Sequence, residues 1–304
     1  TPKPAAISPQ PYNLSSNVIH PFSDGLRKWA ARLKACGKEK TMKLKLLLLS
    51  AFISLTGTAH AQRIVVLTPD TADIVAALGA LDEIVGRDQT VQNPALKNKP
   101  SIGIHRRLTV EPIVAAKPDI AIGSWMAQPA DIFAHLQKAG IKAVNVAPDD
   151  SIAAYPQSIR NIGQLIGKSA QADKLASKWQ ADMKQQPSSG KRYLFSYDGR
   201  IVSGKNTAAD EIIRRAGGIN AAAAIDGLKP MTREAWIAAK PDIIIIADHN
   251  TAMIGNVKTF AARPEIAGSP AAKNGKIYLW KANDMFRYGL DTPQVIQRLH
   301  GLAK

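Results

Sequence analysis

A twelve-residue sequence occurs twice in this chain of 304 residues. Residues 109–120 read TVEPIVAAKPDI and residues 232–243 read TREAWIAAKPDI, so eight positions are identical at a constant offset of 123. Each copy predicts a short helix, a Lys-Pro-Asp turn and an apolar strand. A repeat at this distance indicates two similar α/β lobes. The cleft between two such lobes is a favourable place for a ligand.

Strand and helix patterns alternate through most of the chain. Strands are predicted at 63–67, 81–86, 120–123, 142–146, 193–197, 243–246 and 277–280, and helices at 71–78, 127–139, 151–166, 169–185, 208–216, 256–262 and 293–302. This order predicts an α/β fold of two Rossmann-like lobes with central parallel sheets, joined by a long rigid helix. The expected boundaries are 62–168 for the first lobe, 169–187 for the connecting helix and 188–304 for the second lobe.

Residues 42–61 have the pattern of a secretory signal peptide. Two lysines precede the apolar run 46–55, and an Ala-His-Ala sequence ends at Ala61. The run is shorter than a membrane span, so we expect export and cleavage after Ala61. Residues 1–41 are rich in Pro and Ser, and we expect them to be a disordered or non-native upstream extension.

Export and charge together narrow the class of partner. Residues 62–304 carry 31 basic and 22 acidic side chains, a net charge of +9. A basic chain suggests nucleic acid, but export argues against that partner and favours a local basic patch for an anionic ligand. The only cysteine, Cys36, does not stand at the end of the signal. We therefore expect a soluble, monomeric periplasmic protein of the Gram-negative type.

Across residues 62–304 the order of parts resembles the class III periplasmic substrate-binding proteins of ABC importers for haem, siderophores and cobalamin. The two Thr-x-Glu-x-x-x-Ala-Ala-Lys-Pro-Asp copies and the helix predicted between the lobes carry this resemblance. Residues 202–210 (VSGKNTAAD), 216–218 (AGG) and 103–108 (GIHRRL) look most like the haem-binding branch, and residues 288–293 fit it more loosely. The resemblance implies that haem is the transported ligand, that the lobes close only slightly, and that an inner-membrane permease and ATPase complex receives the haem.

One position departs from the haem-binding pattern. Haem-binding relatives usually carry a Tyr directly after the Gly of this first motif as the axial iron ligand, and this chain has Ile104 there. His105 comes next, and imidazole is a common haem ligand, so His105 is the candidate iron ligand, with a solvated loop histidine as the alternative. Arg106 and Arg107 follow, and guanidinium groups match haem propionates in charge and geometry, with a solvated basic pair as the alternative.

Further ligand contacts are expected from loops that follow strands. The candidates in the second lobe are Tyr197, His249, Met285, Arg287 and Tyr288, and the candidate in the first lobe is Trp125. Core packing is the alternative for Tyr197 and Trp125, since buried aromatic rings more often pack than bind ligands. For His249 the alternative is a cap at the end of its strand.

Glu111 and Glu234 occupy equivalent positions in the two repeat copies. In the family that the chain resembles, one such acid in each lobe docks onto arginines of the two permease subunits. The alternative is an acid placed in the first turn of a helix because the helix dipole favours it there.

Two other classes of function are weighed against a haem carrier. A ferric siderophore or cobalamin binding protein becomes more credible because Ile104 replaces the Tyr. An exported enzyme lacks support, since the sequence has no Gly-x-Ser-x-Gly, His-Glu-x-x-His or Walker A motif. A zinc or manganese carrier is disfavoured because the histidines after residue 61 are sparse and scattered.

Overall fold

The computed structural model describes residues 61–304, so the predicted signal peptide, apart from Ala61, and the upstream extension lie outside the described residues. The first lobe is built on a four-stranded sheet of β1 (Ile64–Val66), β2 (Ile84–Arg87), β3 (Ile120–Gly123) and β4 (Lys142–Asn145). The strands run in the order β2-β1-β3-β4 and all pairs are parallel, as expected. Every residue of β1 and β3 is buried, which is typical of central strands in a parallel sheet.

Short helices connect these strands. They are α3 (Pro69–Ala77), α4 (Val110–Ala115), α5 (Ile132–Lys138) and the 3₁₀ turns η1 (Pro94–Leu96) and η2 (His105–Arg107). α3 begins two residues before the predicted start because Pro69 occupies the first helical turn, where a missing amide hydrogen does no harm.

The second lobe contains a mixed sheet rather than the purely parallel one expected. Its strands are β5 (Arg192–Ser196), β6 (Ile201–Ser203), β7 (Ile219–Asn220), β8 (Leu228–Pro230), β9 (Ile243–Ala247) and β10 (Ile277–Trp280). The order is β10-β9-β5-β6-β8, with β7 also pairing with β5. β10, β9 and β5 are parallel, whereas β6 is antiparallel to both β5 and β8. The sequence analysis predicts no strand in the segment 201–207, yet this segment begins with β6.

That strand forms because a tight turn reverses the chain after β5. The Asp198 carboxylate accepts hydrogen bonds from the amides of Arg200 (2.9 Å) and Ile201 (2.7 Å), and Gly199 has a φ of +82°. Side-chain acceptors and positive φ are the usual means of closing such a turn.

Seven helices and two 3₁₀ turns complete the second lobe as the structure describes it. They are α8 (Ala208–Arg215), α9 (Arg233–Ala239), α10 (Thr251–Ile254), α11 (Val257–Ala261), α12 (Pro264–Ala267), α13 (Pro270–Lys273), α14 (Thr292–Gly301), η3 (Asp248–Asn250) and η4 (Ala282–Asp284). No helix of residues 61–304 is long and apolar enough to cross a membrane.

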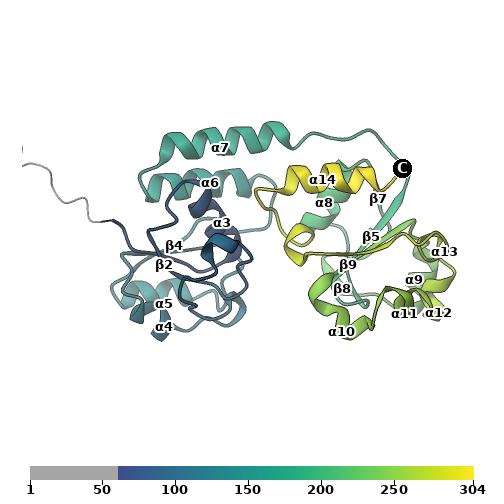
Figure 1. The fold of residues 1–304 in the computed structure, drawn as a ribbon, viewed down its shortest axis with the longest axis horizontal. Helices are drawn as coiled ribbons and strands as arrows, with labels where there is room; N and C mark the ends of the chain where they lie inside the picture. Colours follow the sequence, from purple (N-terminus) through teal and green to yellow (C-terminus); the bar gives the residue numbers. More distant parts are fainter. Residues whose placement is uncertain (1–60) are drawn as a thin grey trace, which may run out of the picture. The chain divides into compact units, whose positions relative to one another are not determined.

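In chain order, α6 (Ala154–Leu165) and α7 (Ser169–Asp182) come between the two sheets, and they run side by side over the first lobe (Figure 1). The helix predicted over 169–187 ends at Asp182, and residues 183–191 have no regular secondary structure. The helix stops because α8 takes its next backbone groups: the Arg215 guanidinium binds the carbonyl of Met183, and the Gln186 amide donates to the Arg215 carbonyl at 2.7 Å. The connection is thus a helix followed by an irregular segment, not one long helix.

One hydrophobic core runs through both lobes. Its buried members come from β1, α3, α6 and α7 on one side and from β5, α8, β9 and α14 on the other. Trp179 of α7 is buried in this core, and its indole nitrogen donates to the carbonyl of Gly289 at 2.8 Å. The two lobes are therefore packed against each other, not merely tethered.

The repeated sequence forms the same structure twice, as predicted. Lys117 and Lys240 both adopt positive φ, 47° and 40°, at the ends of α4 and α9. Asp119 then accepts the Arg63 amide at 2.8 Å, and Asp242 accepts the Arg192 amide at 2.8 Å. Each Lys-Pro-Asp turn thus ties its helix to the start of the neighbouring parallel strand.

Candidate functional site

Parallel α/β sheets bind ligands outside the carboxyl ends of their strands. Three polar or aromatic side chains predicted from the sequence follow such ends: Trp125 after β3, Tyr197 after β5 and His249 after β9. The structure brings Tyr197 and His249 together, with a hydrogen-bond distance of 3.2 Å between the Tyr197 hydroxyl and His249 Nε2.

A side chain from the first lobe completes this group. Arg106 of η2 donates from Nη1 to the Tyr197 hydroxyl at 3.2 Å, and its guanidinium carbon lies 5.8 Å from the centre of the tyrosine ring. Phe286 packs edge-on against the same ring, with centroids 5.6 Å apart. We call these four residues, Arg106, Tyr197, His249 and Phe286, the cleft cluster, after the cleft that the sequence predicts between the lobes.

The turn that carries Arg106 is held by a buried carboxylate. Asp88, which directly follows β2, accepts the backbone amide of His105 and the amide of Thr90, the latter at 2.8 Å. The His105 ring is buried too, with Nδ1 3.3 Å from Asp88 Oδ2 and 3.2 Å from the Thr90 hydroxyl. The turn therefore exposes Ile104 and the two arginines and keeps His105 inside.

Arg287 and Tyr288 occupy a different place from the cleft cluster. Arg287 is buried and pairs across the lobes with Asp73 of α3 at 3.3 Å, while its Nε has no hydrogen-bond partner. Burial raises the pKa of Asp73, against the lowering effect of Arg287. Tyr288 is buried edge-on against Trp179, with centroids 6.2 Å apart. Both residues belong to the core between the lobes.

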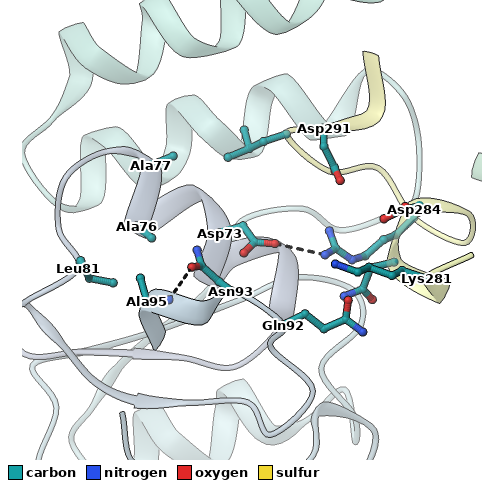
Figure 2. A pocket seen from close by; sticks show the side chains of 13 residues that line it. Asp73, Ala76, Ala77, Leu81, Gln92, Asn93, Ala95, Lys281, Asp284 and Asp291 are labelled. Atoms are coloured by element: carbon teal, nitrogen blue, oxygen red, sulfur yellow. Dashed lines mark hydrogen bonds and ion pairs between the residues drawn. The ribbon is translucent and has the colours of Figure 1, made fainter. Parts of the chain in front are cut away.

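A cavity of about 480 Å³ lies beside this core (Figure 2). Figure 2 shows Asp73 and Asn93 on one side of it and Lys281, Asp284 and Asp291 on the other. Its lining thus comes from both lobes. No local sequence pattern indicates Asp73 or Asn93 as a lining residue, because neither follows a strand end or belongs to a motif.

Trp125 lines a narrow crevice near the cavity together with Asp150, Tyr155 and Tyr288. Burial raises the pKa of Asp150 to about 7. Trp125 therefore lies against the acidic inner face between the lobes. None of its described contacts is with the cleft cluster.

Glu111 and Glu234 are exposed in the first turns of α4 and α9. The pKa of each is lowered, first by a hydrogen bond from its own backbone amide and then by the side chain of the preceding threonine, Thr109 or Thr232. Both lobes thus present a carboxylate that is held in its charged form.

Within residues 61–304, no group of three or more His, Cys, Asp or Glu side chains is arranged to hold a bare metal ion. Phe286, Asp88 and Asp73 are the contributors that the sequence analysis missed. The sequence could have indicated two of them. Phe286 lies between the candidates Met285 and Arg287, and Asp88 directly follows the strand β2.

Two α/β lobes that share a core and gather ligand-type side chains between them define a two-lobed binding protein. Residues 64–283 match the model of the periplasmic binding protein family, and the chain belongs to this family.

Three relatives extend this assignment. The uncharacterized ABC transporter substrate-binding lipoprotein YvrC of Bacillus subtilis strain 168 is 27% identical over 257 residues, which cover 80% of this chain and 79% of that protein. The apo structure of the periplasmic heme-binding protein RhuT from Roseiflexus sp. RS-1 is 31% identical, with a TM-score of 0.74 over 80% of this chain and 99% of that one. The periplasmic heme-binding protein HutB of Vibrio cholerae is 28% identical, with a TM-score of 0.71 over 80% and 98% of the two chains. The resemblance drawn from the sequence is confirmed.

Proposed function

We propose that this protein captures haem in the periplasm, in the cleft between its lobes, and delivers it to an ABC importer of the inner membrane. The cleft cluster carries the proposal. A phenol, an imidazole, a guanidinium and a flat aromatic ring meet there from both lobes. The names of RhuT and HutB, which are heme-binding proteins, and of YvrC, which is an ABC transporter substrate-binding lipoprotein, support the same reading.

Each member of the cleft cluster has a haem-binding use. Tyr and His side chains are established axial ligands of haem iron, and Tyr197 stands at the centre of the cluster. Arg106 and the neighbouring exposed Arg107 match the two propionates, since charge-assisted hydrogen bonds to carboxylates suit guanidinium geometry. We assign Tyr197 as the iron ligand, with His249 beside it.

His105 is the competing iron ligand. A ligating histidine usually donates its second ring nitrogen to a carboxylate, and Asp88 stands at that position next to Nδ1. Nε2 would be the ligating atom, but the side chain is only 6% exposed. Iron ligation by His105 therefore requires the η2 turn to open, whereas Tyr197 needs only to exchange its contacts with Arg106 and His249.

A ferric siderophore or cobalamin is the second candidate ligand. The observation that favours it is Ile104, which stands 37% exposed where haem-binding relatives usually place the ligating Tyr. Exposed apolar surface suits a bulky chelate whose iron is already coordinated.

A hemin titration followed by the Soret band tests these assignments. The wild-type protein is expected to shift the band at one-to-one stoichiometry or above, Tyr197→Phe to alter the band and weaken binding, and His105→Gln to leave the spectrum unchanged. Tyr278→Phe, on β10 away from the cleft cluster, is the matched control. A spectrum changed by His105→Gln and not by Tyr197→Phe moves the ligand to His105. No hemin shift, with tryptophan quenching by a ferric siderophore or cobalamin instead, overturns haem as the ligand.

The exposed acids complete the proposal. We assign Glu111 and Glu234 to docking on the permease, because each lobe presents one charged carboxylate at the same repeat position.

A further inference from the structure

The two repeat copies expose side chains at corresponding positions. These are Glu111, Val114, Ala115 and Lys117 on α4 and its turn, and Glu234, Ile237, Ala238 and Lys240 on α9 and its turn, while α9 also exposes Arg233 where α4 has the half-buried Val110. We call these sets the α4 face and the α9 face. Within each face, the glutamate and the β-branched residue stand three positions apart, so they are neighbours on one side of the helix.

The inward side of each helix is matched as well. Ile113 and Trp236 stand at the same repeat position, and both are buried. Because each helix is also fixed to its sheet by the same Lys-Pro-Asp contact, the two faces hold equivalent orientations on their own lobes. The two faces are thus equivalent in structure and not only in sequence.

Val114 is 40% exposed and Ile237 is 58% exposed. The large exposed apolar side chains of the described chain also include Ile104, Ile219, Leu228, Met253 and Leu279. Only Val114 and Ile237 occupy corresponding positions in the repeat, and each stands beside a carboxylate held in its charged form. A docking surface has an apolar centre and a polar rim, so in each face the apolar residue would form the centre and the carboxylate the rim.

We propose that the α4 and α9 faces are two copies of one docking element, in which Val114 and Ile237 are apolar anchors that enter equivalent sockets on two like subunits of the importer. The charge of Glu111 and Glu234 calls for a cationic side chain beside each socket. A single chain with two equivalent faces matches a partner with two equivalent subunits. This inference rests on the proposed function, because it takes the importer as the partner.

The experiment measures binding of the full protein to the source cell's ABC importer in lipid nanodiscs, with association and dissociation rates followed separately. The double substitution Val114→Gln and Ile237→Gln removes both anchors and places a good helix former at each position. We expect dissociation to become roughly tenfold faster, with association and its salt dependence unchanged, because apolar contact acts mainly after encounter. Each single variant is expected to give part of this effect.

Ile219→Gln is the matched control, since Ile219 is 47% exposed and lies on β7, outside the repeat. Its dissociation rate is expected to equal that of the wild type. If the double variant also dissociates like the wild type, the anchors are refuted, whatever the ligand proves to be. Hemin titrations of the same variants test the haem proposal separately from the anchor proposal. If the protein binds no hemin and the double variant still dissociates faster from the importer, the anchors are supported and haem is overturned as cargo. A wild-type protein that binds no importer overturns both.

Discussion

At the scale of single residues, Asp150 shows how the inner face between the lobes affects ionisation. It follows β4, and burial is the main cause that raises the pKa of its carboxyl to about 7. Asp70 and Asp149 add to this rise, while the Ala208 backbone amide and Arg287 oppose it. The folded protein therefore holds this proton more tightly than the unfolded chain does.

This difference in proton affinity makes the stability of the folded protein depend on pH. The stabilising contribution is fully present below the ordinary carboxyl pKa of about 4 and is lost as the pH rises through about 7, with a slope of at most about 1.4 kcal/mol per pH unit. Asp150→Asn is expected to remove this loss, so the variant should gain stability over the wild type as the pH rises from 4 to 7. Urea unfolding at several pH values measures the difference.

Asp82→Asn, an exposed acid between α3 and β2, serves as the control for Asp150. The difference in unfolding free energy between Asp82→Asn and the wild type is expected to stay constant between pH 4 and 7. A constant difference for Asp150→Asn as well would show that the Asp150 carboxyl ionises as in the unfolded chain.

Sequence patterns identify which residue types lie near the site but not their directions. Arg106, Tyr197 and His249 are expected from loop position, and the structure joins all three. His105 and Arg287 are expected by the same logic, yet both side chains are buried. The difference arises from partners far away in sequence, Asp88 for His105 and Asp73 for Arg287, which no local pattern reveals.

At the scale of elements, the pair α6 and α7 depends on one close contact. A Cβ added at Gly163 of α6 would lie 2.2 Å from the Cβ of Ala172 on α7. Gly163→Ala is therefore expected to separate the helices and to destabilise the protein by about 1–3 kcal/mol, because overpacking a well-filled contact costs this much. Urea unfolding measures the loss.

Gly301→Ala in the last turn of α14 provides the comparison, because an added Cβ there meets no atom within 4 Å. It should leave stability unchanged or slightly raise it, since alanine is the better helix former. Equal effects of the two substitutions would mean that the α6–α7 contact tolerates the extra methyl group.

Strands that are continuous apolar runs are predictable here, and strands that form through pairing distant in sequence are not. β1, β3 and β9 are continuous apolar runs, which local sequence is enough to identify. β6 and β8 have only three residues each and form by pairing with each other and with β5, so they depend on contacts distant in sequence. The end of α7 is set in the same way, by Arg215 of α8.

At the scale of the whole molecule, the shared core limits how far the lobes can move. Trp179 donates a hydrogen bond to Gly289, and Asp73 pairs with Arg287, so a hydrogen bond and an ion pair both cross between the lobes. Breaking them would expose apolar surface and leave Arg287 without its partner carboxylate, at a cost of several kcal/mol. We therefore expect only a small closure when the ligand binds, even though the connection includes an irregular segment.

Two lobes held in a nearly fixed arrangement present Glu111 and Glu234 as a pair of charges. Removing both, with Glu111→Ala and Glu234→Ala, is expected to leave hemin binding intact, because neither residue belongs to the cleft cluster. It should raise the protein concentration needed for half-maximal stimulation of ATP hydrolysis by the reconstituted importer roughly tenfold, since two exposed ion pairs are lost. The association rate should fall and lose part of its salt dependence, because exposed charges act mainly on encounter.

The charge-conserving pair Glu111→Asp and Glu234→Asp is the control for this double substitution, and it should retain most of the stimulation. Each single alanine variant should lose about half of the logarithmic effect if the two lobes contribute independently. Stimulation by the double alanine variant equal to that of the wild type would remove these acids from the docking surface. A full loss from one single variant, with no effect from the other, would show that the importer contacts one lobe through its acid and that the pseudo-symmetry of the repeat is not used in docking.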